Sequence, residues 1–160
     1  EIVNTLVDPG MPIPRASTLI HQITDAMVAG APPISEAAKE FHAFSRESVI
    51  VAHNAPFDMA FLRRHASVAG VEWTHPILDT VLLSAIAFGQ SEEHTLDALC
   101  SRMGVSIAAE LRHTAMGDAL ATAQVLCKLL PMLNARGLDT LGKVIEESRK
   151  HGRLLSDANN

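Results

Sequence analysis

SVIVAHNAPFD, residues 48–58, is the stretch of the sequence that points most directly to a fold. Residues 48–52 form a short apolar run that is typical of a buried β-strand. Asn54 and Pro56 are helix-start signals, because proline loses nothing in a first helical turn whose N–H groups are unpaired anyway. Asp58 then falls in the first turn of that helix, just beyond the end of a strand, where open α/β sheets present ligand-binding groups.

Strand and helix patterns alternate on both sides of this stretch, which predicts an α/β layer domain. The expected strands are residues 1–7, 48–52 and 76–78, and the expected helices begin at Ser35, Pro56, Asp79, Thr95, Thr114 and Asp139. Gly70, Gly89 and Gly104 are expected to end three of these helices, and Pro131 to kink or end another. We assign residues 1–135 to one domain and residues 136–160 to a C-terminal helical extension.

Composition limits the kind of partner that the chain can bind. Its 160 residues carry a net charge of −5, from 13 Lys and Arg against 18 Asp and Glu, which argues against broad electrostatic capture of nucleic acid. A polyanionic substrate would need local cations, and bound metal ions are the obvious source. Cys100 and Cys127 lie among apolar residues at helical spacing, which favours buried, reduced thiols and a cytoplasmic protein. The longest apolar run, near residues 81–88, is too short to span a membrane.

A second motif, HTAMGDA at residues 113–119, combines a histidine with a carboxylate. If His113 and Asp118 were both helical, their side chains would point about 140° apart, because each residue turns the helix by roughly 100°. If His113 lies in the loop before the helix, its imidazole can reach the cluster that Asp118 joins. Carboxylates with a histidine base suit phosphodiester hydrolysis by two divalent cations, and hard oxygen ligands favour Mg²⁺ or Mn²⁺.

The two motifs together resemble a known family. Residues 53–58 and 113–119 are similar to the second and third motifs of the DEDDh (DnaQ-like) 3′-5′ exonucleases, and most of all to the proofreading subunits of bacterial replicative polymerases. Residues 20–24, 78–80 and 95–100 add flanking matches, so that the resemblance runs from the first residue to about Leu133. It implies a ribonuclease-H-like mixed sheet flanked by helices.

The resemblance also implies a mechanism and a set of site residues. Two Mg²⁺ or Mn²⁺ ions would support stepwise release of nucleoside monophosphates from a single-stranded DNA or RNA 3′ end. Asp118 would bind the metal that activates water, Asp58 would help to hold the second metal, and His113 would be the general base. The implied substrate contacts are Asn54, Phe57 and, less directly, His21. A polymerase subunit is a further implied partner.

Two departures from the family pattern affect these expectations. No part of the chain matches the first motif, an Asp-x-Glu on the first strand, so two of the four metal carboxylates and the first two strands of the sheet are missing. A two-cation site with only Asp58 and Asp118 would be undercharged. The 160 residues alone are therefore expected to be inactive and to be a fragment of a longer protein. In addition, Gln22 stands where the family usually has glycine.

Several residues near the motifs have simpler structural explanations. We expect Asp79 to cap its helix and shape the neighbouring loop, and His53 to pack at the end of its strand. Four aromatic residues are expected in the core: Phe41, Phe44, Phe61 and Trp73. Two other functions stay open, a non-catalytic interaction module with an exonuclease-like fold and an RNA-directed oligonucleotidase.

Overall fold

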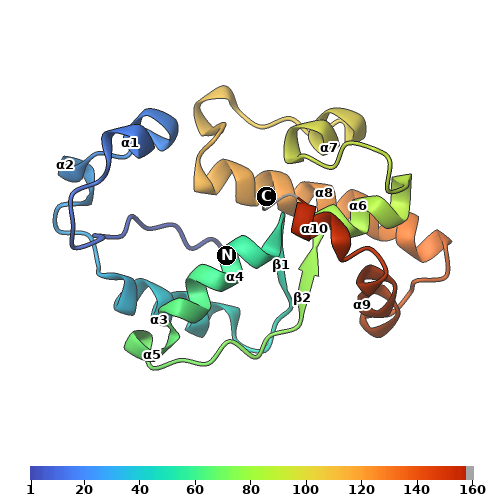
Figure 1. The fold of residues 1–160 in the computed structure, drawn as a ribbon, viewed down its shortest axis with the longest axis horizontal. Coiled ribbons are helices and arrows are strands. Elements are labelled where there is room, and N and C mark those ends of the chain that lie inside the picture. Colours follow the sequence, from blue (N-terminus) through green and yellow to red (C-terminus); the bar gives the residue numbers. More distant parts are fainter. Residues whose placement is uncertain (158–160) are drawn as a thin grey trace. The chain divides into compact units, whose positions relative to one another are not determined.

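The structure is a computed structural model that describes residues 1–157. The chain divides into two compact units, Glu1–Val49 with Met59–Pro76, and Ile50–Asp58 with the chain from Ile77 onward. In chain order the elements are α1 Arg15–His21, α2 Asp25–Val28, α3 Ile34–Ser45, β1 Ile50–Ala52, α4 Ala55–Arg64, α5 Ala66–Ala69, β2 Ile77–Asp79, α6 Thr80–Phe88, α7 Leu96–Met103, the 3-10 helix η1 Ala109–Leu111, α8 Ala115–Ala135, α9 Leu141–Arg149 and α10 Arg153–Asp157 (Figure 1).

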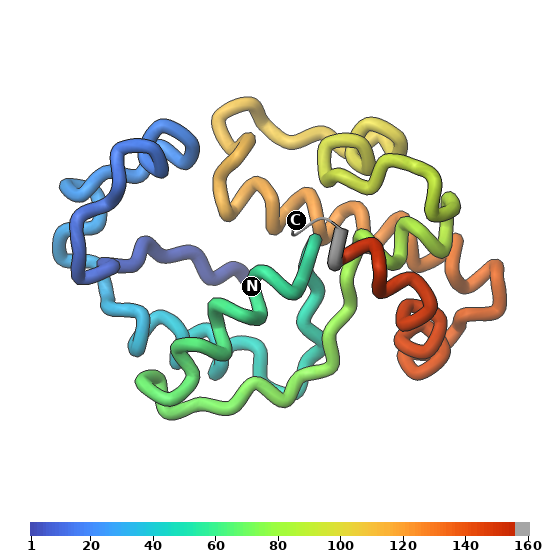
Figure 2. Tube along the Cα trace, viewed as in Figure 1, coloured from blue at the N-terminus to red at the C-terminus, as the bar shows by residue number. Residues whose placement is uncertain are grey.

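The second unit is built around a short parallel sheet. β1 and β2 pair in parallel, with Val51 opposite Leu78 and Ala52 opposite Asp79. The backbone trace shows the two strands side by side, with α4 and α6 leaving their ends (Figure 2). Because both strands end at the same edge of the sheet, the residues that follow them, His53 and Thr80, are brought together there.

The core of the second unit forms where α6 packs against α8. Eight of the nine residues of α6 are buried, which explains its mostly apolar sequence. The fully buried side chains of the facing helices include Leu99 of α7 and Val125, Leu129 and Leu133 of α8. Arg136 fixes the far end of α6 by donating hydrogen bonds of 2.6 and 2.7 Å to two of its last carbonyl groups.

The predicted C-terminal extension begins with a helix that packs on the same core. α9 contacts α6 and buries Val144 and Ser148. Residues 158–160 of the predicted extension lie outside the described residues. Within residues 1–157, no helix is both long enough and apolar enough to cross a membrane.

The first unit is centred on Trp73. Its indole N–H donates to the Leu62 carbonyl at 3.1 Å, and its ring lies 5.6 Å from the Phe41 ring. His42 of α3 packs edge-on against Trp73 and makes a 3.1 Å hydrogen bond with the Glu72 carbonyl. These contacts join α3 to the segment that follows α5.

The predicted strand at residues 1–7 is wrong. No strand is assigned there, the nearest pairing is an isolated bridge between Asp8 and Pro33, and Ile2 is 70% exposed. An alternating pattern becomes a strand only where a neighbouring strand accepts its hydrogen bonds. The sheet of the described residues accordingly has two parallel strands, whereas a mixed sheet was predicted.

Most predicted helix ends are confirmed. Asp79, Thr95 and Thr114 each cap a helix through a side-chain oxygen, and Gly89 and Gly104 occupy C-cap positions. The helix predicted from Pro56 to Gly70 is instead two helices, because α4 ends at Arg64 and Gly70 is the C-cap of the short α5. The predicted cap at Ser35 is wrong, because α3 begins one residue earlier, after Pro33. Pro131 does not end its helix, which continues to Ala135.

Three burial predictions are also wrong. Phe44 and Phe61 are 41% and 53% exposed, although the buried Trp73 and the half-buried Phe41 do lie in the first unit's core. Cys127 is exposed and Cys100 half-buried, both as free thiols. In each case the apolar periodicity identified a helix correctly but did not show how much of its face a neighbour would cover.

Candidate active site

A buried carboxylate organises the edge of the sheet where β1 and β2 end. Asp79 is only 4% exposed, and its oxygens accept hydrogen bonds from three backbone N–H groups. The backbone nitrogens of Asn54 and Ala55 lie 3.1 and 2.7 Å from the Asp79 carboxylate oxygens, and that of Val81 lies 2.9 Å away. Three donors offset the cost of burying a charged group. The prediction that Asp79 caps its helix and shapes the adjoining loop is confirmed.

Asn54 takes a conformation that few residues adopt. Its φ is +63°, in the left-handed region that short polar side chains such as asparagine tolerate best. Its side-chain Oδ1 is buried and has no hydrogen-bond partner among the described residues. An unpaired buried acceptor costs about 1–3 kcal/mol. Asn54 therefore keeps an unpaired acceptor beneath the surface at the edge of the sheet.

Phe57 and Asp58 lie in the first turn of α4. Phe57 is 72% exposed, as a stacking residue would need to be. Loss of solvation around its carboxyl raises the pKa of Asp58, its own backbone N–H opposes that shift, and the negative charge of Asp79 raises it further. Asp58 therefore lies within electrostatic reach of Asp79.

His53 links this edge of the sheet to the start of α8. Its Nδ1 lies 2.9 Å from the Thr80 hydroxyl, which itself donates to the Ala52 carbonyl at 3.3 Å, so His53 Nδ1 is the donor of the pair. Burial lowers the pKa of His53; the carboxylates of Asp79 and Asp118 raise it, and His94 lowers it. The histidine packs at the end of its strand, as predicted, within reach of both aspartates.

His113 lies in a loop and not in the helix, which decides between the two arrangements that the sequence left open. Its φ is +61°, and the next residue, Thr114, caps α8 by accepting a 3.0 Å hydrogen bond from the Gly117 N–H. The Thr114 hydroxyl donates to the Leu111 carbonyl at 2.7 Å. His113 and Asp118 are both exposed and line the same cavity of about 270 Å³.

A glycine makes this arrangement possible. A Cβ atom on Gly117 would lie 1.9 Å from the Leu111 carbonyl oxygen, so any side chain would push η1 away from the first turn of α8. The close approach of η1 fixes where the chain turns back through His113. In the motif HTAMGDA, the lack of a side chain at Gly117 is what allows this close approach.

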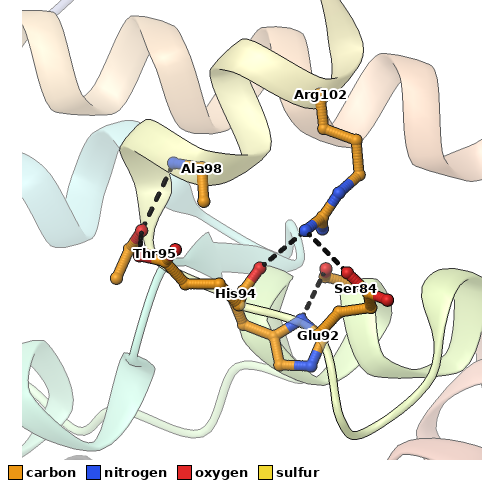
Figure 3. A network of polar contacts seen from close by, with 7 residues as sticks. Ser84, Glu92, His94, Thr95, Ala98 and Arg102 are labelled. Carbon is orange, nitrogen blue, oxygen red and sulfur yellow. Dashed lines mark hydrogen bonds and ion pairs between the residues drawn. The ribbon is translucent and has the colours of Figure 1, made fainter.

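The loop before α7 is held by a polar network that sequence reasoning missed (Figure 3). The Ser84 hydroxyl lies 2.8 Å from His94 Nδ1, and Arg102 donates to the Glu93 carbonyl at 3.1 Å and to a Glu92 carboxylate oxygen at 3.4 Å. Burial lowers the pKa of His94, and the charge of Arg102 lowers it further. The network joins α6 to α7, which forms one wall of the cavity beside His113.

The described residues do not complete a two-cation site. Within residues 1–157, no group of three or more His, Cys, Asp or Glu side chains is arranged to hold a metal ion. Asp58 and Asp118 are exposed carboxylates, but the oxygens of the nearby Asp79 are already engaged by backbone N–H groups. The metal centre and the roles of the site residues therefore remain predictions.

His21 belongs to the first unit, whereas Asn54, Asp58, His113 and Asp118 belong to the second. It ends α1, and its Nδ1 accepts a 3.0 Å hydrogen bond from the Ile23 N–H. The following Gln22 has a φ of +60°, in the left-handed region that glycine adopts most easily.

Residues 1–126 match a protein-family model described as "Exonuclease". The chain belongs to the DnaQ-like exonuclease family. Proteins of this family generally use divalent metal ions. The matched residues contain every predicted site residue of this exonuclease-family chain.

Two curated relatives have names that refer to DNA polymerase III. The chain is 57% identical over 159 residues to a DNA polymerase III subunit epsilon-like protein of Rhodobacter capsulatus, covering 99% of this chain and 23% of the relative. It is 37% identical over 129 residues to the PolC-type DNA polymerase III of Clostridium perfringens, covering 79% of this chain and 9% of the relative. The chain therefore spans less than a quarter of the length of either relative.

A solved structure supports the fold. Exonuclease X in complex with 5′ overhanging duplex DNA superposes with a TM-score of 0.67 and 27% sequence identity, covering 92% of this chain and 83% of that one. The predicted ribonuclease-H-like α/β fold is confirmed by this match.

Proposed function

We propose that the chain is a 3′-5′ exonuclease domain that hydrolyses phosphodiester bonds at single-stranded 3′ ends during DNA proofreading or repair. The observation that carries the proposal is the exonuclease match over residues 1–126, which includes Asp58, His113 and Asp118 within one compact unit. The negative charges of Asp79 and Asp118 both raise the pKa of His53, and that of Asp79 also raises the pKa of Asp58.

The proposed roles follow from where each side chain lies. His113, on an exposed loop, takes the proton of the attacking water, because a histidine can accept a proton at neutral pH. Asp58 and Asp118 each contribute a carboxylate to the binding of divalent cations, with Mg²⁺ or Mn²⁺ favoured by oxygen ligands. Asn54, which follows β1, and Phe57, in the first turn of α4, contact the terminal nucleotide, and the exposed ring of Phe57 does so by stacking.

DNA is the proposed substrate and a polymerase the proposed partner. The relatives named above are a DNA polymerase III subunit epsilon-like protein and a PolC-type DNA polymerase III, and the similar Exonuclease X structure contains DNA. The net charge of −5 fits a domain that is delivered to its substrate by a partner better than one that captures nucleic acid through its surface.

A product analysis tests the proposal. The full-length protein is incubated with a 5′-labelled single-stranded DNA, the same strand ending in a 3′-phosphate, and an RNA of the same sequence, each with Mg²⁺, Mn²⁺ or EDTA. We expect a ladder of products shortened from the 3′ end, no ladder in EDTA, and slow cleavage of the blocked strand. Preference for short RNA would instead indicate an oligonucleotidase, and binding without cleavage an interaction module.

A further inference from the structure

The cavity between α7 and the start of α8 has no role in the proposal above beyond being the space that His113 and Asp118 face. Its volume is about 270 Å³, and all of its lining residues belong to the second unit. Val105 and Ala121, which are 8% and 3% exposed, contribute apolar surface. A ligand in this cavity would contact apolar side chains and the two proposed catalytic groups at once.

Among residues 1–157, Arg112 is the one Lys or Arg side chain that lines the cavity. Its guanidinium lies 3.7 Å from the Asp97 carboxylate, and the two side chains are 58% and 72% exposed. An ion pair this long and this exposed contributes at most about 1 kcal/mol. A phosphodiester can bind a guanidinium through two parallel hydrogen bonds, so it can displace Asp97 at little cost.

We propose that this cavity binds a nucleotide of the substrate strand adjoining the scissile bond, with its phosphodiester on Arg112 and its sugar or base against the apolar wall. The inference rests on the proposed function. In this arrangement Arg112 is the local cation that a chain of net charge −5 needs in order to hold a polyanion beside His113 and Asp118.

Asp97 opposes nucleotide binding in this arrangement. It lines the cavity and competes with the substrate phosphate for Arg112. Removing its charge should therefore strengthen nucleotide binding, whereas removing Arg112 should weaken it. If the ion pair between Arg112 and Asp97 were only structural, both substitutions would change the nucleotide affinity in the same direction.

Cys100 is a natural reporter of occupancy, because its half-buried thiol lines the same cavity. Burial raises the pKa of this thiol, Asp97 raises it further, and Arg112 lowers it. Cys127, exposed elsewhere on α8, provides a matched control thiol.

The first test measures binding of a fluorescent 12-nucleotide oligothymidylate to the full-length protein in EDTA. R112A should raise Kd about tenfold, R112K should raise it less, and the slope of log K against log salt should fall by about 0.7 for the single lost phosphate contact. D97N should lower Kd two- to threefold, and D97N/R112A should match R112A. K128A and E146Q, two exposed positions with the same charge changes, should bind like the wild type.

The second test follows alkylation of both cysteines by mass spectrometry, with and without the oligothymidylate. The oligonucleotide should slow alkylation of Cys100 at least fivefold and leave Cys127 unchanged. Wild-type affinity and salt slope in R112A, no difference between D97N and E146Q, or no protection of Cys100 would each overturn the inference. Failure of the proposed function is seen separately, as absence of cleavage by the wild-type protein.

Discussion

The β1–α4 turn and the η1–α8 turn each place a proposed catalytic residue at the start of a helix, but they are held in different ways. The first is fixed from inside by the buried Asp79, which binds the backbone of Asn54 and Ala55. The second is held at the surface, by the Thr114 hydroxyl and by the space that Gly117 leaves. The position of Asp58 therefore depends on the buried core, whereas the position of His113 depends on local contacts. These local contacts can be altered without unfolding the domain.

The largest expected effect comes from removing the internal support. D79A leaves three backbone N–H groups without their acceptor and should lower the free energy of unfolding by about 5 kcal/mol, at roughly 1.5–3 kcal/mol for each bond to a charged group. D79N keeps one of the two side-chain oxygens and should lower the free energy of unfolding by about half as much. Urea denaturation measures both. A loss below 1 kcal/mol in D79A would show that the turn does not need this carboxylate.

The next effect tests the steric support of the other turn. G117A places a Cβ atom against the Leu111 carbonyl and should cost about 1–3 kcal/mol, the usual range for overpacking. The rate of DNA cleavage should fall by more than the loss of stability explains, because the loop that carries His113 must move. A matched control is G142A, whose Cβ would meet nothing within 4 Å. Equal activity in G117A and G142A would contradict this account of the turn.

A smaller effect is expected from the hydroxyl at the same turn. T114A removes the N-cap of α8 and should destabilise the protein by about 1 kcal/mol, while T114S, which keeps the hydroxyl, should behave like the wild type. Thermal unfolding of the three proteins tests this. An unchanged midpoint in T114A would mean that η1 and Gly117 suffice to hold the turn.

The smallest effect concerns the charge of Asp58. Its pKa is raised above the ordinary value of 3.8, so the folded state favours the protonated form, and the resulting stability is present below pH 3.8 and is lost as the pH rises through the higher folded value. D58N should therefore gain stability relative to the wild type over that pH window, measured in EDTA. A constant difference between the two proteins at every pH would contradict the direction of the shift.

The sequence allowed much of the second unit to be predicted, because its signals are local. Asp79 and Thr114 were recognisable as helix caps, and the order of the two motifs was enough to indicate the family. The place of Asp79 between a strand and a helix predicted its cap bond to the Val81 N–H, whereas its bonds to Asn54 and Ala55, distant in sequence, were not predicted.

Features that depend on contacts distant in sequence were not predictable. Residues 1–7 alternate like a strand but have no neighbouring strand to pair with, and Phe61 has the spacing of a core residue but is half exposed. The cavity beside His113 depends on how α7 packs against α8, which a network around His94 and Arg102 supports. Nothing in the local pattern of either residue indicates that network.

The most direct test of the central claim compares the full-length wild-type protein with H113A and D118N on a 5′-labelled single-stranded DNA in Mg²⁺. We predict a ladder of products shortened from the 3′ end for the wild type, and a rate lowered by about 10²–10⁴ in H113A, the usual contribution of a general base. The cleavage rate of D118N should fall at least as far. Its thermal unfolding midpoint should equal that of the wild type. Wild-type rates in both variants would contradict the assignment of this site.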